Sequence, residues 1–225
     1  MVRRAAAPAE KENSALEQLC RAYWFPVYAY ARKQGCSASD AEDVTQDFFA
    51  EIMQSQFLQR ADRSQGKFRS YLLGSVRNRI INSHERAKAL KRGGAFDFVS
   101  IDEPMAEEQF RDINDPALDP AQAYELSWAL TVLQRARGRV IDEQKAKGRL
   151  VEFEKLEPFL SVPPSDGEYA EIAQQLGISR NHVAVSIHRL GRRYRDLLRE
   201  EVAQTVSEPS EIEEELAYLL KVLAR

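Results

Sequence analysis

The chain contains only two cysteines, and none of its apolar runs is long enough to cross a bilayer. Cys20 and Cys36 alone make neither a disulfide framework nor a zinc site, which favours a reducing compartment such as the cytoplasm. The N-terminal residues are basic or small and lack the apolar segment of a secretory signal. We therefore expect a cytoplasmic protein without membrane insertion, in which Cys20 is a buried thiol.

Motifs for catalysis and cofactor binding are absent as well. The three histidines, His84, His182 and His188, stand at no metal-ligand spacing with cysteine or carboxylate residues. The sequence has no glycine-rich phosphate loop and no GxSxG motif. We predict that the protein is not an enzyme and has no catalytic residue, no metal site and no cofactor.

Glycine and proline are scarce, with 10 and 9 copies among 225 residues, and the alternation typical of strands is absent. We predict an all-α fold in which Pro26 kinks the first helix. The first predicted helix begins near Asn13. Further helices are predicted at 40–54, 68–88, 120–147 and 151–160, on either side of Gly177, and at 209–223.

Charge is unevenly distributed, although the net charge is only −3. Residues 60–92 carry ten bases and two acids, a charge of +8, whereas residues 100–125 carry −7 and residues 200–225 carry −5. Such segregation suits a protein that touches both a nucleic acid and a basic protein surface. Solvated acidic faces and a flexible linker are an alternative explanation of the two acidic blocks.

Residues 169–198 have the pattern of a helix-turn-helix. In the first helix Tyr169, Ile172, Ala173 and Leu176 share one apolar face. Gly177 can take the left-handed conformation that ends a helix, and Ser179 is a good N-cap for the next one. The second helix carries six arginines against one acid between residues 180 and 199. This pattern favours a DNA-reading unit over a simple helical hairpin with a basic face.

One face of that second helix is predicted to enter the major groove, with its N-terminal half at the base edges. The residues of this recognition face are Arg180, Asn181, Val185, His188, Arg189 and Arg192. A solvent-facing side chain is an equally good reading of His188.

The chain resembles the sigma-70 family of bacterial RNA polymerase sigma factors, and most closely its compact extracytoplasmic-function (ECF) group. The blocks that carry the resemblance are DAEDVTQDFF at 40–49, FRSYLLGSVRNRIINSHERAK at 68–88, and the helix-turn-helix. The resemblance implies two small helical domains joined by an acidic linker, with an extra C-terminal helix. Its implied divisions are a region 2-like domain at 10–94, a flexible linker at 95–120, a region 4-like domain at 121–205, and an acidic extension at 206–225.

The resemblance also implies partners and contact residues. Core RNA polymerase would be bound, through the coiled coil of its largest subunit, by Asp40, Glu42, Asp43, Gln46, Asp47 and Phe49. Promoter DNA would be read and melted at the −10 element by Arg63, Lys67, Arg69, Tyr71, Arg77, Asn78 and Arg79, and read as duplex at the −35 element by the recognition face. Core packing is the favoured role of Tyr71, and helix capping with surface acids is an alternative for residues 40–51. An anti-sigma factor or another regulator is a further possible partner.

Two segments depart from minimal ECF members. Residues 120–164 are longer and more charged than usual, and the extension EIEEELAYLLKVLAR follows the helix-turn-helix. Its apolar residues are expected to dock on another helix. Alternatively, the extension binds a regulator, or its negative charge covers the basic recognition face. A self-sufficient repressor or activator would explain the C-terminal half equally well, but it would not explain an acidic helix followed by a strongly basic one. The arginine clustering argues against a purely structural scaffold.

Overall fold

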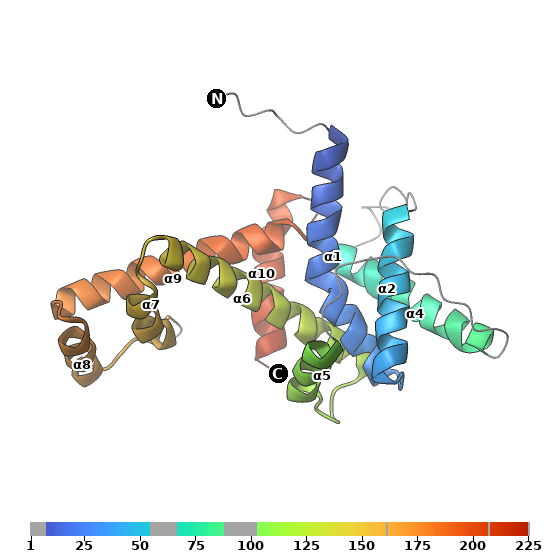
Figure 1. Ribbon diagram of the computed structural model, residues 1–225, viewed down its shortest axis with the longest axis horizontal. Helices are drawn as coiled ribbons and strands as arrows, with labels where there is room; N and C mark the ends of the chain where they lie inside the picture. Colours follow the sequence, from blue (N-terminus) through green and yellow to red (C-terminus); the bar gives the residue numbers. More distant parts are fainter. Residues whose placement is uncertain (1–7, 55–66, 88–102, 161, 207, 225) are drawn as a thin grey trace. The chain divides into compact units, whose positions relative to one another are not determined.

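The computed structural model describes residues 8–54, 67–87, 103–160, 162–206 and 208–224 (Figure 1). Throughout these ranges the regular elements are helices and no strand occurs, so the predicted all-α class is confirmed. The chain divides into two compact units. Unit 1 comprises Met1–Thr131 with Ala203–Arg225, and unit 2 comprises Val132–Val202.

Unit 1 is built around the long helix α1, Pro8–Lys33, which packs mainly against α2, Ala38–Gln54. Helix α4, Phe68–Ala87, packs on both of these helices. Helix α1 continues through Pro26, which has no N–H to donate to the preceding turn. The remaining elements of unit 1 are α5 (Glu103–Ile113), the first part of α6 (Pro120–Ala146), the 3₁₀ turn η3 (Pro209–Glu211) and α10 (Ile212–Leu223).

Aromatic residues dominate the core of unit 1. The Tyr23 ring on α1 stacks on Tyr124 of α6 at 6.4 Å between centroids and meets the edge of Phe68 at 5.9 Å. Burial, followed by the nearby charge of Glu215, raises the Tyr23 pKa, so this hydroxyl stays protonated. Cys20 is buried, as predicted. These contacts pack the middle of α1 against the starts of α4 and α6 around one apolar centre.

The predicted flexible linker is wrong over Glu103–Ile113, which forms α5 and packs on α1 and α2. Ala106 and Phe110 are buried, three to four residues apart on one face of this helix. Glu107 fixes the helix by accepting hydrogen bonds from Arg32 and Tyr28 of α1. The segment has linker composition because its other face is solvated and acidic.

Unit 2 contains the rest of α6 with α7 (Leu150–Leu156), η2 (Glu157–Phe159), α8 (Asp166–Leu176) and α9 (Arg180–Ala203). Leu156 joins Ile172 and Ala173 of α8 and Val183 and Ile187 of α9 in one apolar cluster. A second cluster links Ala136, Val140, Phe153 and Leu197. The helices predicted from the 3.6-residue period therefore bury the faces that the sequence indicated.

The division between the two compact units falls inside α6 and α9, at residues 131–132 and 202–203. The boundaries of the functional domains at residues 121 and 205 stay a prediction. Tyr124 and Trp128 lie in the core of unit 1, which explains why the start of α6 belongs there. The C-terminal extension also belongs to unit 1, so unit 2 is an insertion in the chain of unit 1.

Candidate nucleic-acid and polymerase interfaces

Helices α8 and α9 are joined by a three-residue turn with well-defined caps. Gly177 has a φ of 64°, in the left-handed region, and Ser179 accepts a hydrogen bond from the backbone N–H of His182 at 3.2 Å. The start of α8 has a capping box between Ser165 and Glu168, which the sequence analysis missed although its S-x-x-E spacing was visible. Ile178 packs against the apolar cluster beneath the turn. The angle between α8 and α9 is thus fixed by local chemistry.

The predicted recognition face lies on the solvent side of α9. All six of its residues are exposed: Arg180, Asn181, Val185, His188, Arg189 and Arg192. Val183 and Ile187, on the opposite side, are buried against α8. Within the described part of the chain, the ion pairs do not involve Arg180, Arg189 or Arg192. This face therefore presents three unengaged guanidinium groups to solvent.

Another arginine of α9 has a structural role instead. Arg193 forms a bidentate pair with Glu143, with Nη2 2.6 Å from Oε1, and also reaches Glu200 at 3.3 Å. The hydrogen bonds to Glu143 raise the Arg193 pKa and lower that of Glu143. Arg135 and Arg139 of α6 hold buried Glu201 in the same way. The unusual charge of residues 120–164 is thus used largely to join α6 to α9.

Helix α2 carries the predicted polymerase-binding acids. Asp40, Asp43 and Asp47 are exposed, while Glu42 is half-buried and accepts a hydrogen bond from Gln46 at 2.9 Å. Asp40 itself receives a hydrogen bond from the Ser37 hydroxyl at the start of the helix. The acids therefore form a solvent-facing surface on α2.

The assignment of Phe49 to that surface is wrong. Its side chain is 2% exposed and meets the edge of Phe48 at 5.3 Å. Both phenylalanines belong to the core because the buried face of α2 is wide and also includes Ala41, Thr45 and Ile52.

The structure brings together two residues that were assigned to different partners. Arg79 of α4 reaches Asp47 at 3.3 Å and also bonds to Glu51, both on α2. The guanidinium is half-buried between them. Arg79 therefore ties α4 to the acidic helix, and Glu51 is a partner that the sequence pattern did not reveal because the contact depends on helix packing.

The residues predicted to contact the −10 element differ in how far their side chains are exposed. Arg77 and Asn78 are exposed near the middle of the helix, and Tyr71 is half-buried with its ring 6.5 Å from that of Phe68. Arg63 lies outside the described residues. Arg69, which the resemblance assigns to −10 DNA, is only 6% exposed, so its side chain is not presented to solvent.

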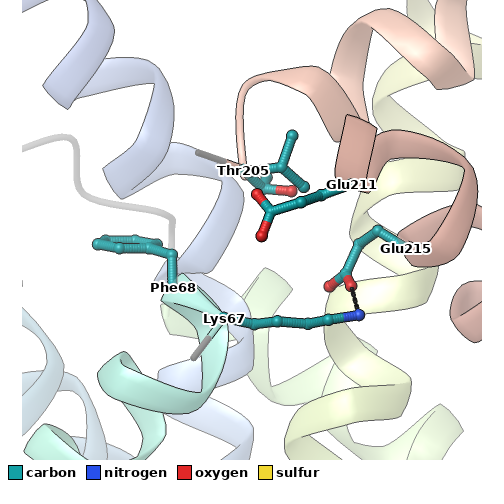
Figure 2. A pocket seen from close by; sticks show the side chains of 6 residues that line it. Lys67, Phe68, Thr205, Glu211 and Glu215 are labelled. Carbon is teal, nitrogen blue, oxygen red and sulfur yellow. Dashed lines mark hydrogen bonds and ion pairs between the residues drawn. The ribbon is translucent and has the colours of Figure 1, made fainter. Parts of the chain in front are cut away.

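Arg69 is enclosed by the C-terminal helix. Its Nε lies 2.7 Å from Oε1 of Glu215, and Lys67 Nζ lies 2.7 Å from Oε2 of the same carboxylate (Figure 2). Glu214 approaches Lys67 at 3.1 Å. The idea that the extension covers the recognition face of α9 is therefore wrong for Glu214 and Glu215, which pair with the start of α4.

The buried face of α10 also differs from the expected stripe. Glu215, Leu219 and Val222 are buried, whereas Leu220, which was expected to dock, is 66% exposed. These three residues are four and three positions apart, so they share one face of the helix. Because Glu215 is a carboxylate, a search for apolar spacing does not find this face.

Residues 19–89 match the family model of sigma-70 region 2. This part of the chain is therefore similar to sigma-70 region 2. The match covers most of α1 and the whole of α2 and α4, so the acidic helix and the basic helix both fall inside it. No curated protein and no solved structure matches the chain.

In sigma factors of the sigma-70 family, region 2 acts in transcription initiation and recognises the −10 promoter element. Sigma-70 region 2 binds core RNA polymerase and promoter DNA. Sigma factors are not enzymes, and the family match therefore supports the prediction of a non-enzymatic protein. None of the described helices has the length and apolar character needed to cross a membrane.

Proposed function

We propose that this chain is an ECF-type sigma factor that recruits core RNA polymerase to promoters with two elements. The region 2 match supports the polymerase and −10 functions in unit 1. The observation that supports −35 reading is the capped α8–α9 pair, whose six predicted contact residues are all exposed. Because polymerase and chromosomal DNA share the cytoplasm, that is the compartment in which it acts.

The acids of α2 dock on a basic surface of the polymerase, which we propose is the coiled coil of the largest subunit. Asp43 and Asp47 are exposed, so their charge is available to steer the encounter and fix its register. Asp47 keeps its partner Arg79 on the other helix, which aligns α4 with the docking surface. Polymerase binding and −10 reading are then coupled through one ion pair.

At the −10 element, the exposed amide of Asn78 reads the edge of an unpaired base, and Arg77 binds phosphate. Flipping a base costs a few kcal/mol, which contacts from a pocket and from cations must offset. At the −35 element, Arg189 and its neighbours on α9 meet base edges in the major groove, where a good bidentate pair contributes about 1–3 kcal/mol of discrimination.

Transcription in vitro with core polymerase tests these assignments. We expect Arg189→Ala to weaken promoter binding about 10-fold or more while leaving permanganate reactivity of the bound −10 region unchanged. Asn78→Ala should give the opposite pattern, with retained −35 protection and reduced melting. Arg195→Ala, exposed on α9 outside the recognition face, is the control. Equal losses in all three variants would contradict the division of roles.

A self-sufficient transcriptional regulator is the alternative function. It would bind an operator as a dimer without polymerase. The region 2 match disfavours it, because a repressor has no need of a polymerase-binding domain.

A further inference from the structure

Two cations at the start of α4 are neutralised by the protein's own C-terminal helix. The two oxygens of Glu215 are divided between Lys67 Nζ and Arg69 Nε, each at 2.7 Å. The Glu215 side chain is 3% exposed, and those of Arg69 and Lys67 are 7% and 26% exposed. Glu214, 72% exposed, adds a second contact to Lys67 at 3.1 Å. One buried carboxylate thus bridges both cations.

Aromatic rings complete the enclosure of Arg69. The guanidinium carbon lies 3.8 Å from the centroid of the Tyr218 ring, on α10, and 5.3 Å from that of Trp128, on α6. Lys67 Nζ also lies over Tyr218, at 5.9 Å. These distances are within the range of cation–π attraction. Helix α10 therefore supplies both the counter-charge and one of the two flat faces around Arg69.

The remaining space admits no competing ligand. The pocket lined by Lys67, Phe68, Thr205, Val206, Glu211 and Glu215 has a free volume of about 10 Å³, close to the room that one water needs. Figure 2 shows Lys67 and Glu215 meeting at one side of this pocket. A phosphate group can reach Arg69, and can bind Lys67 and Arg69 together, only after α10 moves away.

The bridging carboxylate makes the contacts that a phosphate would make. Lysine and arginine bind phosphate oxygens through the same N–H donors that Glu215 now occupies, and two oxygens on one centre can satisfy both cations. Helix α10 buries Leu219 and Val222 beside Glu215, and its apolar residues Ile212, Leu216 and Leu223 are half-buried. Apolar packing and the ion pairs of Glu215 therefore both hold α10 in place.

We propose that α10 is an autoinhibitory latch, in which Glu215, assisted by Glu214, stands in for the DNA backbone phosphate that Lys67 and Arg69 bind when the latch opens. This inference rests on the proposed −10 function of α4. It explains why a sigma factor buries an arginine that its sequence pattern assigns to DNA. The latch keeps the free protein from binding single-stranded DNA through these two cations.

Single charge-neutralising substitutions in the full-length chain test the latch. Binding to a fluorescein-labelled single-stranded DNA of mixed sequence is measured by anisotropy over a series of salt concentrations. Glu215→Gln should lower Kd about 10-fold at low salt and steepen the dependence of log K on log salt by about 1.4, because each contact with single-stranded phosphate contributes about 0.7. Glu213→Gln, exposed on the same helix, makes the same charge change and should alter neither the slope nor Kd by more than about twofold.

Two further variants separate the latch from general effects. Glu214→Gln keeps the buried pair intact but removes a contact to Lys67, so it should steepen the slope measurably, by up to about 0.7, which provides a test if Glu215→Gln fails to fold. Adding Lys67→Gln to Glu215→Gln should remove about half of the gain. A folded Glu215→Gln with the slope of Glu213→Gln would overturn the proposal, as would unchanged binding by Glu214→Gln if the first variant does not fold.

The outcome is distinguishable from failure of the proposed function. Core-dependent transcription by the wild-type chain, together with an unchanged salt slope in Glu215→Gln, would sink the latch and leave the sigma-factor assignment standing. A steeper salt slope in Glu215→Gln without core-dependent transcription by the wild-type chain would support the contact between α10 and the two cations but reject the sigma-factor assignment.

Discussion

Replacing Glu107 by glutamine tests whether α5 is a structural part of unit 1. The carboxylate accepts hydrogen bonds from the Tyr28 hydroxyl at 2.8 Å and from Arg32 Nε and Nη2, each at 2.9 Å. Its side chain is 17% exposed and that of Arg32 is 21% exposed, so solvent replaces the lost contacts poorly. A hydrogen bond to a charged group contributes about 1.5–3 kcal/mol, and glutamine offers Arg32 one acceptor in place of two. We expect Glu107→Gln to lower the free energy of unfolding by about 2 kcal/mol.

Urea unfolding followed by tryptophan fluorescence is the assay, because both tryptophans, Trp24 and Trp128, are buried in unit 1. Glu108→Gln is the matched control, since its side chain is exposed on the same helix and the change should cost less than about 0.5 kcal/mol. Equal midpoints for the two variants at neutral pH would refute the argument and restore the flexible linker.

The pH dependence gives a second test of the same contact. The hydrogen bonds from Arg32 lower the Glu107 pKa in the folded protein. The stability from this group is therefore fully present above its unfolded pKa, about 4.3, and is lost as pH falls through the lower folded value. The difference in the free energy of unfolding between wild type and Glu107→Gln should be constant from about pH 6 to about pH 8. It should shrink below about pH 4. A difference that persists undiminished in acid would assign the effect to packing rather than charge.

Two further predictions concern unit 2, with circular dichroism as the readout of unfolding. Gly177→Ala should lower the free energy of unfolding by about 1 kcal/mol through its φ of 64° alone, since nothing lies within 4 Å of the added methyl group. Gly167→Ala, also in open space but without a positive φ, should not destabilise the protein. Equal stability of the two variants would contradict this prediction. Glu201→Gln should cost about 3 kcal/mol, because it leaves Arg135 and Arg139 without their buried counter-charge, and a loss no larger than that of exposed Glu171→Gln would show that these ion pairs contribute little.

Local patterns made most of the helices predictable. The predicted helices at 68–88, 120–147 and 209–223 differ from α4, α6 and the η3–α10 pair by one residue or none at their ends. Capping residues and the 3.6-residue period act within one or two turns, so these signals are complete in the sequence. The exposed and buried sides of α9 were predictable for the same reason, because they follow from helical geometry alone.

Charged residues that pair across helices were not predictable. Arg69, Arg79 and Arg193 look like surface cations in the sequence, yet each pairs with an acid on another helix, 146, 28 and 50 residues away respectively. Composition also misassigned α5, because a helix that buries only Ala106 and Phe110 keeps the acidic character of a linker. Long-range pairing decides these positions, and periodicity carries no information about it.

Footprinting with and without core RNA polymerase tests the central claim most directly. We expect the chain and core together to protect an asymmetric pair of elements upstream of the chain's own gene and to open the DNA at the downstream one, whereas either protein alone gives no specific protection. Protection of a palindromic site by the chain alone, unaffected by polymerase, would contradict it.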